Sequence, residues 1–303
     1  MLRSFLLFLS ERELPKKLLL KSSLGRRLAA RFIAGEELDD AIRVVRRLND
    51  AGFEATLDYL GESVHDPATA EEATRAYLKI FDRLAAEKLR SHISIKLTQL
   101  GLDIDEALAA RNLQEIARRA ASLRTFVRID MENSAHTEAT LRAFRAANES
   151  PEVLGIVIQS YLYRSEKDVD ELLGIGARIR LCKGAYKEPA SVAFQDKAEV
   201  DHHYVLLMKR LLASDAYHAF ATHDPAMIAA TREFARQCGL GPDRFEFQML
   251  YGIRRRLQRQ LVEQGYRVRV YVPYGKQWYA YFMRRLAERP ANLFFLLRNL
   301  FKG

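Results

Sequence analysis

Residues 216–250 read AYHAFATHDPAMIAATREFARQCGLGPDRFEFQML, and this stretch decides the fold. A short β-rich run, Ala219–Thr222, is followed by a helical pattern over Ala226–Gln237 and then by a second β-rich run, Phe245–Gln248. A strand, a helix and a strand in this order predict two parallel strands joined by a crossover helix.

The same unit recurs along the chain. Eight runs within roughly 220 residues match a closed (β/α)8 barrel of the TIM type, whose usual size is roughly 250 residues. Because no linker rich in Pro, Gly or Ser divides the repeats, we predict one barrel domain over residues 46–303 and an N-terminal helical extension over residues 1–45. The runs are Phe53–Tyr59, His92–Leu97, Phe126–Asp130, Gly155–Gln159, Ala177–Leu181, Ala219–Thr222, Phe245–Gln248 and Arg267–Val272.

Composition excludes several classes of protein. The 303 residues include 49% hydrophobic residues, which is too many for a disordered chain. The two cysteines, Cys182 and Cys238, cannot form a disulfide framework, and we expect reduced thiols in a cytoplasmic protein. No apolar run reaches the roughly 18 residues of a membrane span. The net charge of +9 implies an acidic partner, but the interspersed acidic residues argue against a nucleic-acid-binding arm.

Both ends of the chain are apolar and basic, over residues 1–34 and 292–303. Amphipathic segments of this kind lie in a membrane interface or pack on the body of the protein. Packing is the commoner outcome, and the sequence leaves both open.

Nearly every β-rich run ends in a polar side chain. Active sites of (β/α)8 barrels lie at the carboxyl ends of the strands, so these side chains are expected to converge into one ligand site. Lys96 and Arg180 make the predicted site cationic, and Asp130 supplies one carboxylate. The alternative is a purely structural network of the same charges.

The last predicted helix, Trp278–Glu288, carries Tyr281, Arg284, Arg285 and Glu288 at positions i, i+3, i+4 and i+7. These residues share one helical face. Adjacent guanidinium groups that face a cavity suit a carboxylate or phosphate, whereas on an exposed face they are only solvated.

The longest connection follows the fifth run and begins Cys182-Lys183-Gly184-Ala185-Tyr186. A cation beside an unhindered backbone N–H suits a phosphate or a polar ring. By contrast, Arg254–Arg256 lies outside any strand end and is interpreted as surface.

Several binding motifs are absent from the sequence. Because there is no G-x-G-x-x-G after a strand and no Walker loop, a dinucleotide would not be held by a Rossmann unit. Adjacent His202 and His203 do not share a helix face, and H-E-x-x-H does not occur, so no metal site is predicted.

Taken together, these motifs resemble the proline dehydrogenases, flavoenzymes with a distorted (β/α)8 barrel that also form the dehydrogenase domain of bifunctional proline utilization A proteins. The resemblance covers residues 40–300. Its most specific part is YVPYG at 271–275 followed by YFMRRLAE at 281–288. The other matching motifs are SIKLT at 94–98, RIDME at 128–132, RLCKGAY at 180–186, ATHD at 221–224 and EFQMLYG at 246–252.

The resemblance implies oxidation of L-proline to Δ1-pyrroline-5-carboxylate, with FAD as the first electron acceptor and a membrane quinone as the second. It also implies a cytoplasmic protein in peripheral contact with the inner face of the membrane, with no nucleic-acid partner.

Carried over by position, Arg284 and Arg285 would clamp the substrate carboxylate, with Lys96 as the third cation. Asp130 would hold Lys96 or an arginine in place, and Arg180 would approach the flavin N5. Residues expected to wall the substrate ring are Leu250, Tyr271 and Tyr281.

Further residues would line the flavin, and Glu288 would pair with the arginines. Lys187 departs from the pattern, because some relatives carry Trp there, and this leaves ring packing beside Tyr186 open. The lining residues are Met131, Gln159, Arg180, Lys183, Gly184, Ala185, Tyr186, Thr222, His223 and Gln248.

Two other functions compete with oxidation. Lys96 at a strand end would suit a Schiff-base aldolase or a related lyase if its pKa were lowered by other cations. A basic protein that docks on a membrane or nucleic acid would need no chemistry at all. A flavin chromophore in the purified protein would distinguish proline oxidation from both the aldolase and the docking protein.

Overall fold

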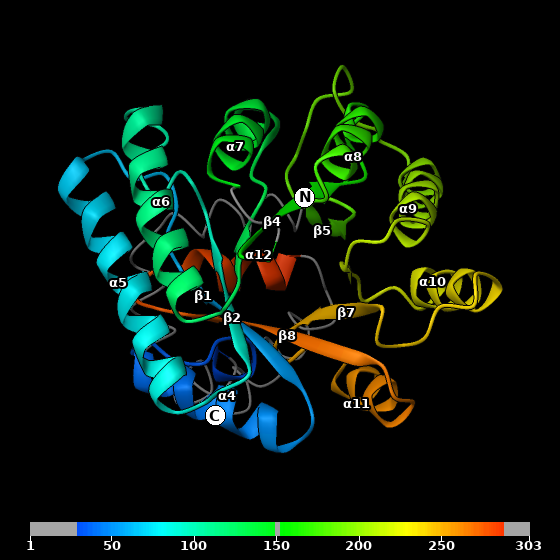
Figure 1. Cartoon of the computed structure of the whole chain (residues 1–303), viewed down its shortest axis with the longest axis horizontal. Coiled ribbons are helices and arrows are strands. Elements are labelled where there is room, and N and C mark those ends of the chain that lie inside the picture. Colours follow the sequence, from blue (N-terminus) through cyan, green and yellow to red (C-terminus); the bar gives the residue numbers. More distant parts are fainter. Residues whose placement is uncertain (1–28, 149–151, 288–303) are drawn as a thin grey trace, which may run out of the picture.

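The computed structural model describes residues 29–148 and 152–287, the last four as backbone only. Eight parallel strands pair in sequence order from β1 to β8, and β8 pairs with β1 to close the barrel. Helices surround this barrel (Figure 1). The predicted (β/α)8 architecture is confirmed.

The elements follow the predicted alternation closely. The strands are β1 (Glu54–Tyr59), β2 (Ser91–Ile95), β3 (Val127–Ile129), β4 (Leu154–Gln159), β5 (Arg178–Cys182), β6 (His218–Ala221), β7 (Phe245–Leu250) and β8 (Arg267–Tyr274). The helices are α4 (Leu38–Asp50), α5 (Pro67–Ala86), α6 (Glu106–Ser122), α7 (Ser134–Ala147), α8 (Ser165–Gly174), α9 (Lys197–Leu212), α10 (Pro225–Gln237), α11 (Arg255–Glu263) and α12 (Trp278–Ala287).

Most of the loops that lead from a strand to the next helix end in a capping residue. Asp224, for example, accepts a hydrogen bond from the Ala226 N–H, and Pro225 follows it in the first helical turn. Such a cap stabilises a helix by about 1 kcal/mol. The same side-chain cap occurs at Asp66, Asp105, Asn133 and Asp196.

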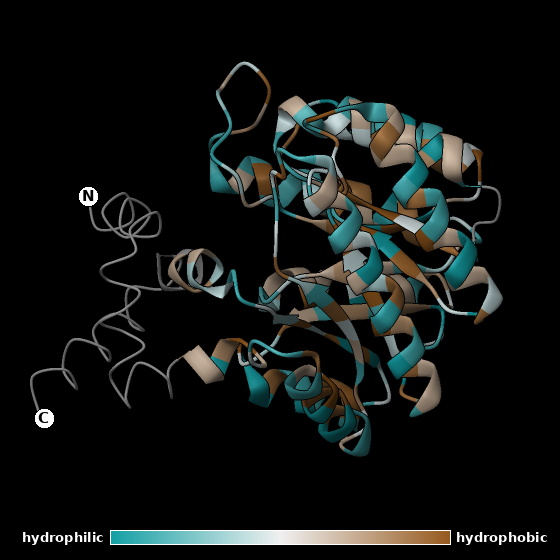
Figure 2. Ribbon diagram, turned by 90° about the vertical axis from the view of Figure 1, so that its left-hand side faces the viewer, coloured by the Kyte–Doolittle hydropathy of each residue, from teal (hydrophilic) through white to brown (hydrophobic). Residues whose placement is uncertain are grey.

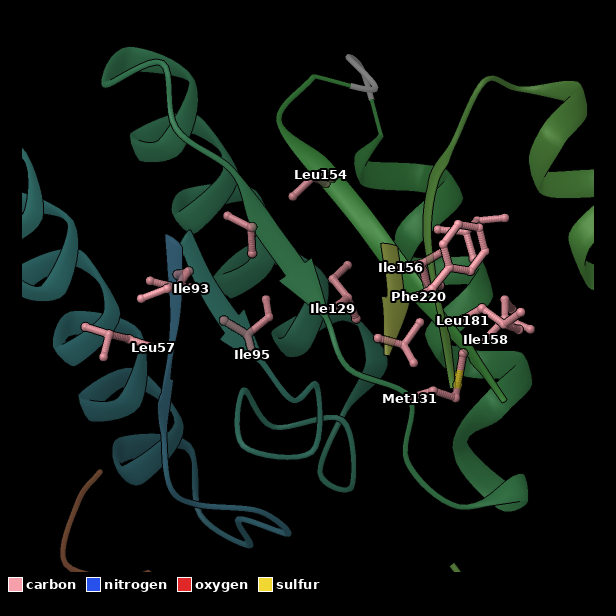
Figure 3. Packing of buried hydrophobic residues seen from close by; sticks show 14 of the residues in the cluster. Leu57, Ile93, Ile95, Ile129, Met131, Leu154, Ile156, Ile158, Leu181 and Phe220 are labelled. Carbon is pink, nitrogen blue, oxygen red and sulfur yellow. The ribbon is translucent and has the colours of Figure 1, made fainter. Parts of the chain in front are cut away.

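The main apolar core lies between the strands and the ring of helices. Alternate strand residues such as Leu57, Ile93 and Ile156 are fully buried in it (Figure 3). Tyr77 and Phe144 approach from the helices. Burial of one such side chain contributes about 1.5–3 kcal/mol, so this layer holds the helices on the barrel.

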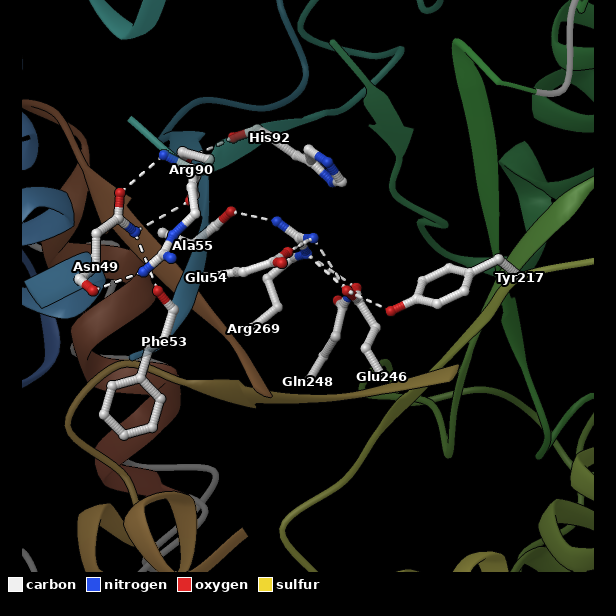
Figure 4. A network of polar contacts seen from close by, with 11 residues as sticks. Asn49, Phe53, Glu54, Ala55, Arg90, His92, Tyr217, Glu246, Gln248 and Arg269 are labelled. Atoms are coloured by element: carbon white, nitrogen blue, oxygen red, sulfur yellow. Dashed lines mark hydrogen bonds and ion pairs between the residues drawn. The ribbon is translucent and has the colours of Figure 1, made fainter. Parts of the chain in front are cut away.

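The inside of the barrel is polar. Arg180 on β5 donates a hydrogen bond across the barrel to Ser94 on β2, which is not its neighbour in the sheet. Near the strand starts, Arg269 donates to Glu246 and Glu54 (Figure 4). Barrels of this type are usually filled by branched apolar side chains, so the polar filling points to a specific use of the interior.

The region before the barrel packs on it. Helix α4 lies against β1 and β8 and continues through the predicted domain boundary between residues 45 and 46, which stays a prediction. Phe32 and Ile33 form a second apolar cluster with Trp278 and Phe282 of α12. The described end of the N-terminal segment therefore packs on the body of the protein. Residues 1–28 and 292–303 lie outside the described residues.

Hydrophilic and hydrophobic residues alternate along the ring helices (Figure 2). Among the described residues, no helix is both long and apolar enough to cross a membrane.

Candidate active site

Five polar side chains from different strands meet at the carboxyl end of the barrel. Asp58 comes from β1, Arg180 from β5 and Tyr271 from β8, while Lys96 and Asp130 follow directly after β2 and β3. Hydrogen bonds link them into two groups, one around Asp130 and one around Lys96. The convergence predicted from the strand ends is thus present in the structure.

Asp130 is the centre of the first group. One carboxylate oxygen accepts a hydrogen bond from Arg180 Nη1 at 2.5 Å, and the other accepts one from the Tyr271 hydroxyl at 2.7 Å. The Arg180 guanidinium also lies 5.5 Å from the Tyr271 ring centre. Asp130 therefore fixes both the cation and the aromatic ring that were predicted to face the cofactor and the substrate.

Lys96 forms the second group with Asp58, whose carboxylate oxygen lies 3.4 Å from Lys96 Nζ. Burial alone would lower the pKa of Lys96, but the charges of Asp58 and Asp130 outweigh it and raise the pKa. Burial raises the pKa of Asp58 despite the nearby ammonium group. Lys96 is therefore held as a cation at neutral pH.

The sequence prediction missed Asp58. It lies at the end of the first β-rich run, where strand-end polarity was not considered, and only 1% of it is exposed. A carboxylate inside an otherwise buried run is the signal that would have found it, because buried charges need a partner.

The predicted substrate wall is partly in place. Leu250 ends β7 and packs against the apolar cluster that contains Tyr281, which is buried on α12. Arg284 and Arg285 also belong to α12, but their side chains lie outside the described part of the chain, as does Glu288 entirely. Their roles stay predictions.

Residues after β3 and β4 form a connected rim. The Gln159 amide donates to the Glu132 carbonyl oxygen at 2.9 Å, and Met131 is buried beside them. The Glu132 carboxylate accepts hydrogen bonds from the Thr98 N–H and hydroxyl, at 3.2 and 2.6 Å. Thr98 and Glu132 were quoted in the motifs without a role, and here they tie the ends of β2 and β3 together.

The loop after β5 carries Lys183, whose ammonium contacts the carboxylates of Asp201 and Asp224, the latter at 2.8 Å. Gly184 follows with a φ of +116°. A Cβ on Gly184 would lie 2.4 Å from the Tyr161 ring, so only glycine fits. Ala185 is exposed and Tyr186 is half-buried in the same loop.

The remaining predicted cofactor residues lie at two depths in the barrel, at its mouth and further inside. His223 lies at the mouth, where its Nε2 accepts a hydrogen bond from the Leu250 N–H at 2.9 Å. The Thr222 hydroxyl accepts from the Asp224 N–H at 3.0 Å. Gln248, in contrast, donates to Glu246 deeper in the barrel (Figure 4).

Chemically, the mouth offers one buried and one partly buried cation, each held by a carboxylate, beside an aromatic ring. Such an arrangement can bind an anionic group and stabilise negative charge that develops nearby. Among the described residues, no cluster of His, Cys, Asp and Glu could hold a metal ion.

Comparisons with known proteins agree with this geometry. Residues 41–298 match the family model "Proline dehydrogenase". Proline dehydrogenase 1 of Bacillus subtilis (strain 168) is 44% identical over 303 residues, covering 100% of both chains. Proline dehydrogenase of Deinococcus radiodurans is 43% identical over 281 residues, covering 91% of each.

A solved structure shares the fold at lower identity. Proline utilization A from Bdellovibrio bacteriovorus, inactivated by N-propargylglycine, superposes with a TM-score of 0.81 and 29% identity. The match covers 86% of this chain and 32% of that one. With the full-length matches and the family model in agreement, the chain belongs to the proline dehydrogenase family.

Proposed function

We propose that this protein oxidises L-proline to Δ1-pyrroline-5-carboxylate with FAD as its first electron acceptor. The observation that carries the proposal is the pair of cations at the barrel mouth, Lys96 and Arg180, each locked in place by its own carboxylate. Lys96, together with Arg284 and Arg285, would grip the acid group of the substrate and orient its ring before reaction, which lowers the entropic part of the barrier. Arg180 would face the cofactor.

The residues present fit a flavin. The Arg180 Nε is buried and has no hydrogen-bond partner among the described residues, so it can donate to a ring nitrogen or oxygen. The loop after β5 adds Lys183, a cation whose ammonium is held by Asp224, directly before Gly184. Arg180, Lys183 and Gly184 would hold the cofactor, while Gln159, Thr222 and His223 would line it. A bound flavin would supply the two-electron acceptor that the reaction needs.

The protonation states of Lys96, Asp130 and Tyr271 indicate whether each of them binds the substrate or acts as a base. Lys96 carries a raised pKa and stays protonated, so it binds the substrate carboxylate rather than removing a proton. Both oxygens of Asp130 accept hydrogen bonds from Arg180 and Tyr271, which suits positioning better than proton abstraction. Burial raises the pKa of Tyr271, and the nearby carboxylates raise it further, so its hydroxyl remains a donor. The substrate amine is therefore expected to lose its proton before binding.

The raised pKa of Lys96 also argues against the aldolase alternative. A Schiff-base lysine needs a lowered pKa to be a nucleophile. Asp58 and Asp130 act on Lys96 in the opposite direction. We therefore favour oxidation over carbon–carbon bond cleavage.

Electrons are proposed to pass on to a membrane quinone during peripheral contact with the inner face of the membrane. The net charge of +9 favours such contact with an anionic lipid surface. Co-sedimentation with anionic and with neutral vesicles tests this part. Equal partitioning into both, or into neither, would contradict it.

The central test is anaerobic mixing of the purified, flavin-loaded protein with L-proline. We expect the visible flavin absorbance to bleach, whereas a colourless protein, or one that keeps its colour, would contradict the proposal. Arg284→Met and Arg285→Met are expected to weaken proline binding by roughly 30- to 100-fold, the loss of about 2–3 kcal/mol from one charged hydrogen-bonding group. Flavin content should not change.

Arg236→Met, on the exposed face of α10, is the matched control and should behave like the parent protein. Unchanged proline affinity in the α12 variants would remove the carboxylate clamp from the proposal without affecting the assignment of the reaction.

A further inference from the structure

A cavity of about 330 Å³ opens at the end of the barrel opposite the candidate active site. Its walls come from residues at the starts of β1, β2, β3, β5 and β8 and from the turns before them. Four arginines and two carboxylates provide its charge: Arg90, Arg124, Arg178, Arg269, Glu54 and Glu152.

Arg269 is fully neutralised by its neighbours. Its guanidinium donates to Glu246 at 2.9 Å and to the Ala55 carbonyl oxygen at 2.8 Å, and it also contacts Glu54 (Figure 4). Glu54 is thereby engaged as well. The net charge of the cavity then depends on the three remaining arginines and Glu152.

Arg178 is held by aromatic rings instead of a carboxylate. Its guanidinium carbon lies 4.7 Å from the Phe126 ring centre and 5.1 Å from that of Tyr217. Its Nε is buried without a hydrogen-bond partner among the described residues. Arg128 lies 4.7 Å from the same Phe126 ring, so two guanidinium groups share one ring. The charge of Glu246 and, more weakly, that of Glu152 attract Arg178, but within the described ranges neither carboxylate forms an ion pair with it.

The rim adds two exposed arginines. Arg124 has a left-handed backbone, with φ at 51°, at the turn before β3. Arg90 donates to the Asn49 carbonyl oxygen at 2.6 Å, a neutral partner that leaves its charge uncompensated. Within the described ranges, neither side chain forms an ion pair with a carboxylate.

His92 completes the wall as a neutral group. Burial, reinforced by the charges of Arg269, Arg128 and Arg178, lowers its pKa well below the usual value. His92 therefore stays uncharged, mainly because it is buried, and its ring can still form a hydrogen bond.

We propose that this cavity is a binding site for a small dianionic oxyanion of the phosphate class, with Arg178 and Arg124 as its principal ligands. Guanidinium groups bind such oxyanions through paired N–H donors. The volume is at the small end of ligand pockets, and the arginine-rich wall disfavours an apolar ligand. The site lies at the end of the barrel away from Lys96 and Asp130 and does not depend on the proposed function.

The test titrates inorganic phosphate into the flavin-loaded protein and follows heat release and thermal unfolding, with sodium chloride at matched ionic strength as reference. At ten times the dissociation constant, bound phosphate is expected to raise the unfolding temperature by about 2–4 °C. Arg124→Gln and Arg178→Gln should each weaken phosphate binding by roughly tenfold, the usual effect of removing one charge-assisted contact.

Two further variants make the test specific. Glu152→Gln removes the opposing charge and should tighten phosphate binding severalfold, a change that mere loss of structure cannot produce. Arg142→Gln, an exposed arginine on α7, is the matched control and should bind phosphate like the parent.

Arg178 packs between rings, and its variant could lose stability, so the exposed Arg124 decides the outcome. Equal phosphate affinity in the parent and Arg124→Gln, or equal protection by chloride and phosphate, would overturn the proposal. Glycerol phosphate and succinate, run alongside, distinguish the sources of the anion. Binding of the phosphomonoester indicates a phosphorylated metabolite, phosphate alone indicates the free ion, and preference for succinate would overturn the phosphate class.

Discussion

The two ends of the barrel are both lined with charged side chains, yet they compensate charge differently. At the carboxyl end, Lys96 and Arg180 each have a carboxylate partner, and the side chains of Lys96 and Asp130 stay 11% and 14% exposed. At the amino end, Glu246 and Arg269 are 3% and 4% exposed and form a closed pair, beside which Arg178 relies on aromatic rings. Under the proposed function, the ion pairs at the carboxyl end orient cations for a ligand, whereas the closed pair at the amino end joins β7 to β8.

The largest effect should come from breaking the closed pair. Glu246→Gln leaves Arg269 buried with only Glu54 as a carboxylate partner, and removal of one member of a buried pair typically costs about 3–5 kcal/mol. Chemical unfolding of the flavin-loaded protein measures this loss.

Glu233→Gln, at an exposed pair on α10, is the control and should change the free energy of unfolding by less than about 0.5 kcal/mol. A loss below about 1 kcal/mol in Glu246→Gln would show that the amino end does not depend on this pair.

A smaller, pH-dependent effect should come from His218 at the start of β6. Its Nδ1 accepts a hydrogen bond from the Ile179 N–H at 3.1 Å, and burial, with Arg128 nearby, lowers its pKa from 6.5 to about 3. Between about pH 6.5 and 3, His218 is therefore protonated in the unfolded chain but neutral in the folded protein. The stabilisation is fully present above about pH 6.5 and is lost as the pH falls toward 3.

Between pH 6 and 5, this one group should contribute a slope of roughly 1.4 kcal/mol per pH unit to the free energy of unfolding. His218→Gln should flatten the measured slope by that amount, while the exposed His202→Gln should leave it as in the parent. Identical slopes in all three proteins would place the acid sensitivity elsewhere.

The smallest effect is expected at the mouth. Tyr271→Phe deletes the hydroxyl that donates to Asp130 at 2.7 Å, but Asp130 keeps Arg180 and partial access to water. We expect a loss of about 1 kcal/mol in stability and up to about a tenfold fall in kcat/KM for proline.

Tyr163→Phe, whose exposed hydroxyl donates to the Ala190 carbonyl oxygen, is the control for the loss of one oxygen. A stability loss in Tyr271→Phe as large as that of Glu246→Gln would erase the contrast between the two ends.

Much of this molecule could be predicted from its sequence. All eight strands fall where β-rich runs were found, because parallel strands buried on both faces leave strong apolar signals. Helices α8 and α11 were not predicted, because they are short, and α11 has few apolar residues to give a period.

The site was predicted less completely than the fold. Lys96, Asp130 and Arg180 were found because they end apolar runs. Lys96 and Asp58 are 38 residues apart and meet because β1 and β2 lie side by side in the sheet, and no local pattern encodes this pairing. The amino-end network escaped notice for the same reason, since Arg269 and Glu54 are 215 residues apart in the chain.

Gly155, the second residue of the buried strand β4, has a consequence for how the strands are joined. A Cβ there would lie 2.5 Å from Arg128 Nη1 and from the Phe126 ring, so the missing methyl group makes a passage for a guanidinium. Through it, Arg128 reaches the Ile156 carbonyl oxygen on β4 and that of Arg178 on β5. One arginine thus joins three successive strands from inside the barrel. Any redesign of this end of the barrel must therefore keep Gly155.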